Sequence, residues 1–366
     1  MLTKPAIAML AFLSLLFFSA PTVWRPLTPT PLPFESFNTV STQRPERLRG
    51  LNKVLHNMTK MGYESDYYLR IWLFQASQVP KDELDRVLQQ ASRGYNKTLI
   101  ITVLNKAYTE KNGMLDLFLR SFRLGKGTKP LLDHLLLAAV DQTAYERCKL
   151  LGLHCYKLVT DGVDFSGEEF YMTGNFVTMM WRRTQFLGEV LQRGYSFIFT
   201  DTDVMWLRNP FLKLNQSSEI DIQFSCDGFN GRPEDESNPL NTGFFFVRSN
   251  NKSIALFDKW YDARNNSGGM KEQDVLLQMI KNGTLRERGI RTRYLDTRYF
   301  GGFCHDYRDF GRVTTMHANC CRTVRAKLMD LSLVLEDWKT YRNGSVVLHN
   351  PHKTCLIDSW DELKGH

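Results

Sequence analysis

Short apolar runs alternate with segments of helical periodicity along much of the chain. The runs TLIITVL (98–104), HLLLAAV (134–140) and YSFIFT (195–200) are each consistent with a buried strand. Between the last two lies EEFYMTGNFVTMMWRRTQFLGEVLQRG (168–194), whose apolar residues recur every three or four positions. This spacing predicts one long amphipathic helix that ends at Gly194.

Two shorter segments also have helical patterns. They are VPKDELDRVLQQASRGYNK (79–97) and QTAYERCKLLG (142–152), and we expect the helices to end at Gly94 and Gly152. Helices that alternate with strands apolar throughout predict an α/β fold, with a mainly parallel sheet covered by helices on both faces. Ligands of such sheets bind beyond the carboxyl ends of the strands.

The amino-terminal part of the chain has a different pattern. Lys4 precedes an uncharged stretch, 5–20, which is shorter than the ~20 residues that usually span a bilayer. A cleaved signal peptide fits this stretch, but proline after its small-residue site favours a signal anchor over residues 1–20, with Lys4 cytoplasmic. Residues 21–59 are proline-rich and predict an extended stem, which leaves 60–366 as one catalytic domain.

Composition excludes some classes of protein. The 366 residues are 43% hydrophobic, which is enough for a sizeable core, and the net charge is +8. Lys and Arg form no dense basic blocks, so we expect no nucleic-acid partner. A solvated basic surface explains the charge, and an acidic polymer substrate or an anionic small molecule is the alternative.

Cysteines and glycosylation motifs indicate an oxidising lumen. The seven cysteines include no CxxC pair, so disulfides are expected and an odd thiol is left free or intermolecular. Asn-X-Ser/Thr motifs occur seven times, where roughly two or three are expected by chance. They begin at Asn57, Asn96, Asn215, Asn251, Asn265, Asn282 and Asn343.

The apolar run 195–200 is followed by two carboxylates, Asp201 and Asp203. Like charges at a buried strand end repel each other unless the pKa of one is raised or a cation is bound. Oxygen ligands suit Mg²⁺ or Mn²⁺, and such an ion commonly bridges to a substrate diphosphate. The alternative is an acid pair that only caps the next turn, since a chain of this length contains ~1 DxD by chance.

Two chemistries use DxD after an apolar strand. A phosphohydrolase with an aspartyl nucleophile would have Thr or Val at position 205, where this chain has Met205, and a later GDxxxD motif, which is missing. A glycosyltransferase would have a downstream histidine and an acid near the donor sugar. His317, in TTMHANCC, is the candidate third metal ligand, and Asp227 and Asp274 are candidate acids.

Residues from about 98 to 341 resemble the plant nucleotide-diphospho-sugar transferase family, which includes rhamnogalacturonan-II xylosyltransferases and extensin arabinosyltransferases. The matching pieces are WRRTQFLGEVLQRGYSFIFTDTDVMWLRNPF, NTGFFFVRS, EQDVL, YLDTRYFGGFC and TMHANCC. The resemblance implies a GT-A fold, type II Golgi topology and a divalent-metal-dependent, retaining transfer from a nucleotide sugar.

The resemblance also implies roles for individual residues. Asp201 and Asp203 correspond to the metal and diphosphate motif, with His317 as the third metal ligand. Other residues are expected to contact the nucleotide, its diphosphate or the donor, namely Thr102, Asn105, Arg183 and Lys327. Asp227 and Asp274 are the acids expected near the donor sugar, and either is a candidate nucleophile if retention is covalent rather than by same-face attack.

We therefore expect a Golgi membrane glycosyltransferase that uses Mn²⁺ or Mg²⁺. Its donor would be a UDP-sugar, with a pentose such as xylose or arabinose favoured by the characterised relatives. Its acceptor would be a cell-wall polysaccharide or a glycoprotein, and it could work within a Golgi enzyme complex. The alternative is a lumenal sugar-binding or scaffold subunit that has lost turnover.

Overall fold

The computed structural model describes residues 80–94, 96–158, 174–305, 309–345 and 354–355. The predicted anchor (1–20), the stem (21–59) and the first residues of the domain predicted from residue 60 lie outside the described residues. Within the described ranges, no helix combines the length and the apolar character needed to cross a membrane.

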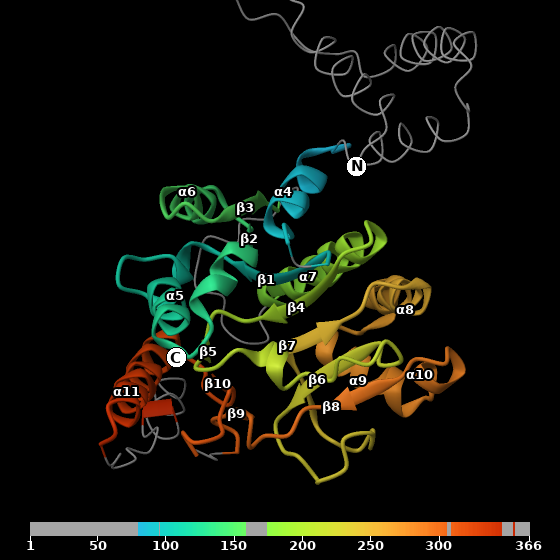
Figure 1. Ribbon diagram of the computed structural model, residues 1–366. Coiled ribbons are helices and arrows are strands. Elements are labelled where there is room, and N and C mark those ends of the chain that lie inside the picture. Colours follow the sequence, from blue (N-terminus) through green and yellow to red (C-terminus); the bar gives the residue numbers. More distant parts are fainter. Residues whose placement is uncertain (1–79, 95, 159–173, 306–308, 346–353, 356–366) are drawn as a thin grey trace, which may run out of the picture. The chain divides into compact units, whose positions relative to one another are not determined.

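A seven-stranded sheet with the order β3-β2-β1-β4-β7-β6-β8 forms the centre of the domain (Figure 1). Its strands are β1 (Thr98–Leu104), β2 (Leu135–Ala139), β3 (His154–Lys157), β4 (Ser196–Thr200), β6 (Ile222–Cys226), β7 (Leu240–Val247) and β8 (Thr292–Tyr294). All neighbours pair in parallel except β7, which is antiparallel to both β4 and β6. The prediction of a mainly parallel sheet is confirmed, with one antiparallel strand in its middle.

Helices cover both faces of this sheet. They are α4 (Glu83–Ala91), α5 (Met114–Leu124), α6 (Gln142–Leu150), α7 (Gly174–Gln192), α8 (Asn251–Asp262), α9 (Glu272–Lys281), α10 (Thr284–Glu287) and α11 (Val324–Arg342). Short 3₁₀ turns are η1 (Lys106–Tyr108), η2 (Lys129–His134), η3 (Pro210–Leu212) and η4 (Ala263–Asn266). The predicted helix 168–194 is confirmed from Gly174 onward, and its first residues lie outside the described ones.

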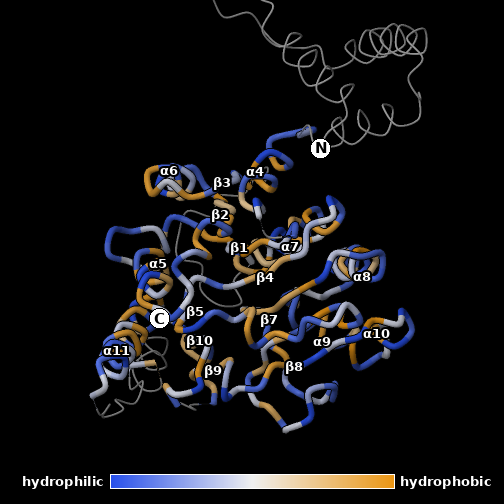
Figure 2. Tube along the Cα trace, viewed as in Figure 1, coloured by the Kyte–Doolittle hydropathy of each residue, from blue (hydrophilic) through white to orange (hydrophobic). Residues whose placement is uncertain are grey.

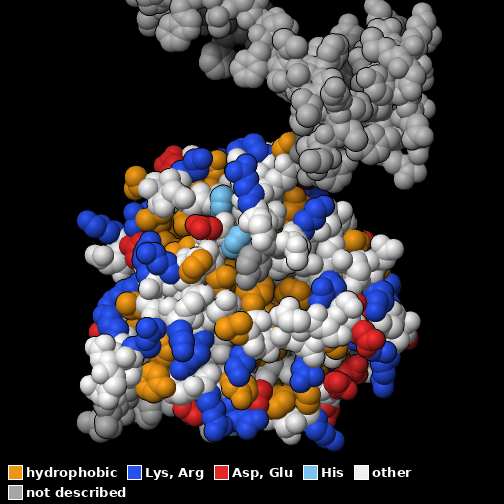
Figure 3. Space-filling view, in the orientation of Figure 1, with side chains coloured by type: hydrophobic (Ala, Val, Ile, Leu, Met, Phe, Trp, Pro, Cys, Tyr) orange, Lys and Arg blue, Asp and Glu red, His pale blue; other side chains and the backbone are white. Residues whose placement is uncertain are grey.

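The core has two halves because successive side chains of a strand point to opposite faces. Ile100 of β1 and Ile198 of β4 pack towards α5 and α11, whereas Leu99 and Phe197 pack towards α4, α7 and α8. Apolar residues accordingly concentrate along the strands in Figure 2. On the face in Figure 3, Lys and Arg are spread among acidic and uncharged side chains, as expected for a solvated basic surface.

A second, three-stranded sheet lies beside the candidate active site that is described below. It has the order β5-β10-β9, formed by β5 (Val204–Trp206), β10 (Thr315–His317) and β9 (Phe300–Gly302). Disulfides join Cys148 to Cys155, Cys304 to Cys320 and Cys321 to Cys355. Cys226 is the free thiol, and burial raises its pKa to about 12, so it stays protonated.

Candidate active site

The two sheets bring the predicted acids and the predicted histidine together. Asp201 directly follows β4, and its backbone N–H donates to Gly243 O of β7 at 2.7 Å. Asp203 lies in the turn that leads into β5. His317 ends β10, which pairs antiparallel with β5, and the N–H of Ala318 donates to Asp203 O at 3.0 Å. The register of the small sheet therefore sets the imidazole beside the acid pair.

These three side chains form a candidate metal site. One ligand atom each from Asp201, Asp203 and His317 lies within 4.8 Å of the others. Gly243 makes room for them, because a Cβ there would lie 2.3 Å from His317 Cε1 and 2.8 Å from Asp201 Oδ2. Two carboxylates and one imidazole suit a small divalent cation, so the residues present fit the metal that the sequence predicted.

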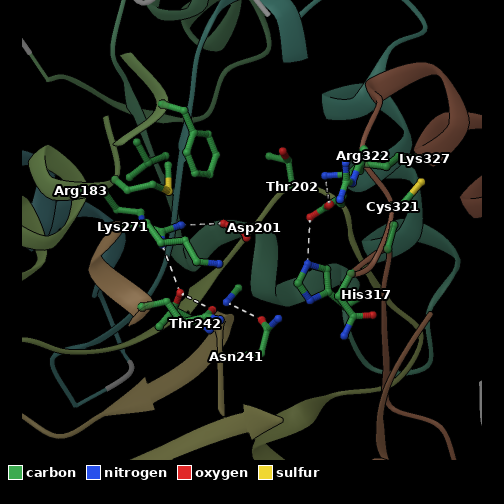
Figure 4. Close-up of a pocket in the computed structure, with 18 of the residues that line it drawn as sticks. Arg183, Asp201, Thr202, Asn241, Thr242, Lys271, His317, Cys321, Arg322 and Lys327 are labelled. Carbon is green, nitrogen blue, oxygen red and sulfur yellow. Dashed lines mark hydrogen bonds and ion pairs between the residues drawn. The ribbon is translucent and has the colours of Figure 1, made fainter. Parts of the chain in front are cut away.

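Asp203 is held between the side chains of His317 and Lys327, both of which are labelled in Figure 4. Lys327 Nζ of α11 lies 2.8 Å from Asp203 Oδ2, and His317 Nε2 lies 3.3 Å from Asp203 Oδ1. Burial opposes ionisation of Asp203, but Lys327 and His317 together lower its pKa. Burial also disfavours the charged imidazole, but Asp203 outweighs that effect and raises the pKa of His317.

Metal affinity is expected to rise with pH. The raised pKa of His317 means that the metal-free imidazole keeps its proton to a higher pH than an ordinary histidine, and a metal ion must displace this proton. Affinity should therefore increase up to about tenfold per pH unit until the pH exceeds that pKa. Calorimetric Mn²⁺ titrations between pH 6 and 9, in two buffers of different ionisation enthalpy, measure both the affinity and the released proton. An affinity that does not change over this range would contradict the expectation.

A buried ion-pair chain forms the opposite wall of the site. Arg183 of α7 is 5% exposed, and its two Nη atoms lie 3.0 Å from Asp201 Oδ1 and 2.6 Å from Glu272 Oε1. Thr242 Oγ1 donates to the same Glu272 oxygen at 2.9 Å. Glu272 Oε2 is buried without a hydrogen-bond partner among the described residues. A buried carboxylate oxygen of this kind is able to accept a hydrogen bond from a ligand.

The first turn of α9 orients its acids differently from the prediction. Glu272 and Gln273 line the cavity, and Gln273 Oε1 accepts from Thr242 N at 2.9 Å. The Asp274 side chain is 40% exposed, lies 3.9 Å from Lys271 Nζ and is not among the residues that line the cavity. The EQD segment thus borders the cavity through Glu272 and Gln273 and not through the predicted Asp274, because the sequence does not indicate which side of the helix turn faces inward.

Asp227 lies inside the site, as its position after a strand predicted. Its Oδ1 accepts from Asn241 Nδ2 at 2.9 Å and from Asn319 Nδ2 at 2.8 Å. Asn241 belongs to β7 and Asn319 to the segment after His317, so Asp227 ties these two segments together. Among the described residues Oδ2 of Asp227 accepts no hydrogen bond, so this oxygen is open to a ligand.

The whole site lines a cavity of about 390 Å³, a size typical of ligand pockets. Asn105 borders it directly after β1, whereas Thr102 is fully buried within β1 and is not a lining residue. Polar lining residues that the sequence did not assign include Tyr108, Asn241, Thr242, Lys271, Glu272, Gln273, Asn319 and Arg322. Asn241 and Thr242 belong to the quoted motif NTGFFFVRS, whose polar start was the available signal.

Residues 130–331, more than half of the chain, match the nucleotide-diphospho-sugar transferase family. An uncharacterised protein of Arabidopsis thaliana is 50% identical over 306 residues, which cover 82% of this chain and 91% of that protein. Arabinosyltransferase RRA2 of Arabidopsis thaliana is 27% identical over 192 residues, which cover 47% of this chain and 42% of RRA2. The solved galactosyltransferase LgtC, in complex with donor and acceptor sugar analogs, has a TM-score of 0.42 at 14% identity and covers 70% of this chain and 98% of its own.

The chain thus belongs to the nucleotide-diphospho-sugar transferase family, and the class of enzyme is glycosyltransferase. The predicted family is confirmed, and so is the α/β domain with its mostly parallel sheet. Family membership also argues against the phosphohydrolase that DxD alone would have allowed.

Proposed function

We propose that this protein is a metal-dependent, retaining glycosyltransferase that moves a pentose from a UDP-sugar to a cell-wall polysaccharide or glycoprotein. The observation that carries the proposal is the convergence of Asp201, Asp203 and His317 at the mouth of the sheet, with Lys327 beside them. The imidazole ligand favours Mn²⁺ over Mg²⁺. The name of RRA2, an arabinosyltransferase, supports a pentose donor.

The Golgi lumen is the proposed location, with residues 1–20 as the anchor of a type II membrane protein. The uncharged stretch after Lys4 and the excess of glycosylation motifs support this part of the proposal. The cysteines support it as well, because three disulfides suit an oxidising compartment.

In the proposed mechanism the residues on each wall of the cavity have a different role. A divalent cation held by Asp201, Asp203 and His317 would neutralise charge on the departing nucleoside diphosphate. Lys327 and Arg322, which both line the cavity, would bind the diphosphate oxygens from the same side. Arg183 and Thr242 hold Glu272 through Oε1, so that Oε2 would accept a hydrogen bond from a hydroxyl of the donor sugar.

Asp227 is the remaining carboxylate of the cavity. The two amides fix it through Oδ1, so Oδ2 is available to the reacting carbon or to the acceptor hydroxyl. Either use agrees with retention, since a carboxylate on this side could act as nucleophile or could orient an acceptor for same-face attack.

A panel of UDP-sugars tests the proposed activity. We expect Mn²⁺-dependent release of UDP from UDP-arabinose or UDP-xylose, faster than from UDP-glucose, and stopped by EDTA. Release is measured with and without candidate acceptors. UDP binding without turnover of any nucleotide sugar would instead favour the sugar-binding or scaffold alternative.

Substitutions of Glu272 and Asp274, which lie in one helix turn, are expected to have very different effects on kcat and stability. Glu272→Gln keeps the shape of the side chain but leaves buried Arg183 with one carboxylate fewer, so we expect kcat to fall about 100-fold and stability to fall by about 3 kcal/mol. Asp274→Asn, on the exposed side of the same turn, should change kcat less than about threefold. Equal losses in the two variants, measured as kcat and melting temperature, would contradict the assignment of Glu272.

A further inference from the structure

A second hollow lies at the end of the main sheet opposite to the active site. It has a volume of about 330 Å³ and is lined by Gly94, Asn96, Thr98, Ser196, Phe211, Leu214, Asn215, Gln216, Phe246 and Arg248. Thr98 and Ser196 begin β1 and β4, whereas Asn105 and Asp201 follow the other ends of these strands. Strands of five to seven residues place the hollow about 15–20 Å from the acids.

Two of the predicted glycosylation motifs line this hollow, beginning at Asn96 and Asn215. Asn96 is exposed, whereas Asn215 is half-buried. The other motifs within the described residues lie on exposed asparagines that do not line it, which are Asn251, Asn265, Asn282 and Asn343.

Asn215 is held rigidly in the hollow. Its backbone N–H donates to Gln223 Oε1 at 2.9 Å, and its carbonyl oxygen accepts from Gln223 Nε2 at 2.9 Å. Its side-chain Oδ1 accepts from Ser217 N at 2.8 Å. Nδ2, the atom that carries an N-linked glycan, makes no hydrogen bond to another of the described residues.

The walls of the hollow suit a carbohydrate. Phe211 is half-buried and Phe246 is 8% exposed, and aromatic rings are good surfaces for the apolar C–H face of a sugar. The Arg248 guanidinium lies 5.7 Å from the centre of the Phe246 ring and donates to Ser217 O at 3.1 Å. Arg248 and the exposed Gln216 also line the hollow and carry N–H groups that can donate hydrogen bonds to sugar hydroxyls.

We propose that Asn215 carries an N-linked glycan whose first sugars are seated in this hollow, against Phe211 and Phe246. The inference rests on the lumenal location in the proposed function, because the modifying enzyme is lumenal. In the modification, Nδ2 of Asn215 loses a proton and bonds to the anomeric carbon of a lipid-linked oligosaccharide, and the bond from that carbon to the lipid pyrophosphate breaks. A glycan seated here leaves the catalytic cavity open to a polymeric acceptor.

The test uses the full-length chain made in a eukaryotic host whose secretory pathway adds N-glycans. Glycopeptide mass spectrometry measures occupancy at each motif, and timed digestion of the folded protein with peptide-N-glycosidase measures how accessible each glycan is. We expect the glycan at Asn215 to be released about tenfold more slowly than the glycan at exposed Asn282, with equal rates after denaturation. Phe211→Ala should reduce this difference to about twofold, with Asn215 still occupied.

Each result has a separate meaning. An unmodified Asn215 beside a modified Asn251 or Asn282 would overturn the inference and leave the lumenal location intact. Equal release from Asn215 and Asn282 in the folded wild type would overturn the seating. No glycan at any motif would overturn the lumenal location together with the inference, whereas UDP release tests the transferase activity independently. A melting temperature for unglycosylated Phe211→Ala equal to that of unglycosylated wild type shows that the variant folds.

Discussion

Asp203→Asn is expected to lower UDP release from the preferred donor by about 1000-fold. In the proposed site the carboxylate would supply one metal ligand, and it is also the shared counter-ion of His317 and Lys327, at 3.3 and 2.8 Å. Its loss removes the negative charge between the imidazole and the ammonium group, and of the described carboxylates only Asp201 remains nearby. Metal affinity should fall as well, which a Mn²⁺ titration of the folded variant measures directly.

The same substitution carries a stability cost that must be separated from catalysis. Removing one partner of a buried charge pair typically costs about 3–5 kcal/mol, and the Asp203 side chain is 5% exposed. Activity is therefore measured at low temperature on protein shown by circular dichroism to be folded. Asp258→Asn, at an exposed position of α8, is the matched control and should retain wild-type activity. A folded Asp203→Asn variant with near-normal UDP release would refute the metal site.

Gly243→Ala should be the most damaging substitution that changes no charge. The added methyl group would lie 2.3 Å from His317 Cε1, closer than any real contact, so the imidazole must move away from the acids. We expect a loss of at least about 100-fold in Mn²⁺ affinity and in UDP release, with a stability cost of about 1–3 kcal/mol. Calorimetry and the UDP-release assay give the two numbers.

A neighbouring glycine provides the control for this prediction. At Gly228 an added Cβ would meet only Pro239 Cγ, at an ordinary 3.8 Å, so Gly228→Ala should reduce activity less than about threefold. If Gly243→Ala bound Mn²⁺ as tightly as wild type, His317 would not need the space beside β7 to serve as a ligand. If both alanine variants lost activity equally, the loss would not be due to the clash with His317.

The bounds of several strands and helices were predictable from local patterns in the sequence, namely apolar runs and the glycines that follow helices. The run TLIITVL forms β1 with the predicted bounds, and helices end close to Gly152 and Gly194, whose φ angles of +68° and +80° other residues rarely adopt. The antiparallel direction of β7 was not foreseen. An apolar strand has the same composition in either direction, and only its neighbours and connections set its orientation.

The part of the candidate site that the sequence predicts consists of chemically suitable residues that directly follow a predicted strand. Asp201 and Asp203 end a buried strand, and in a parallel sheet the strand end is also the ligand-binding edge. The choice of Glu272 over Asp274 was not predictable. Each helical residue is rotated by about 100° from the last, so the packing of α9 against Arg183 and Thr242 decides which acid enters the cavity.

By itself the sequence determined the alternating α/β elements, the acid pair at a strand end and the family of the protein, because these depend on short-range patterns and residue identity. The tertiary structure alone decided that His317 meets Asp203, that Gly243 leaves room for the imidazole and that Glu272 faces inward. These facts depend on strand register and helix rotation. Both are set by contacts between segments far apart in the chain, which no local pattern records.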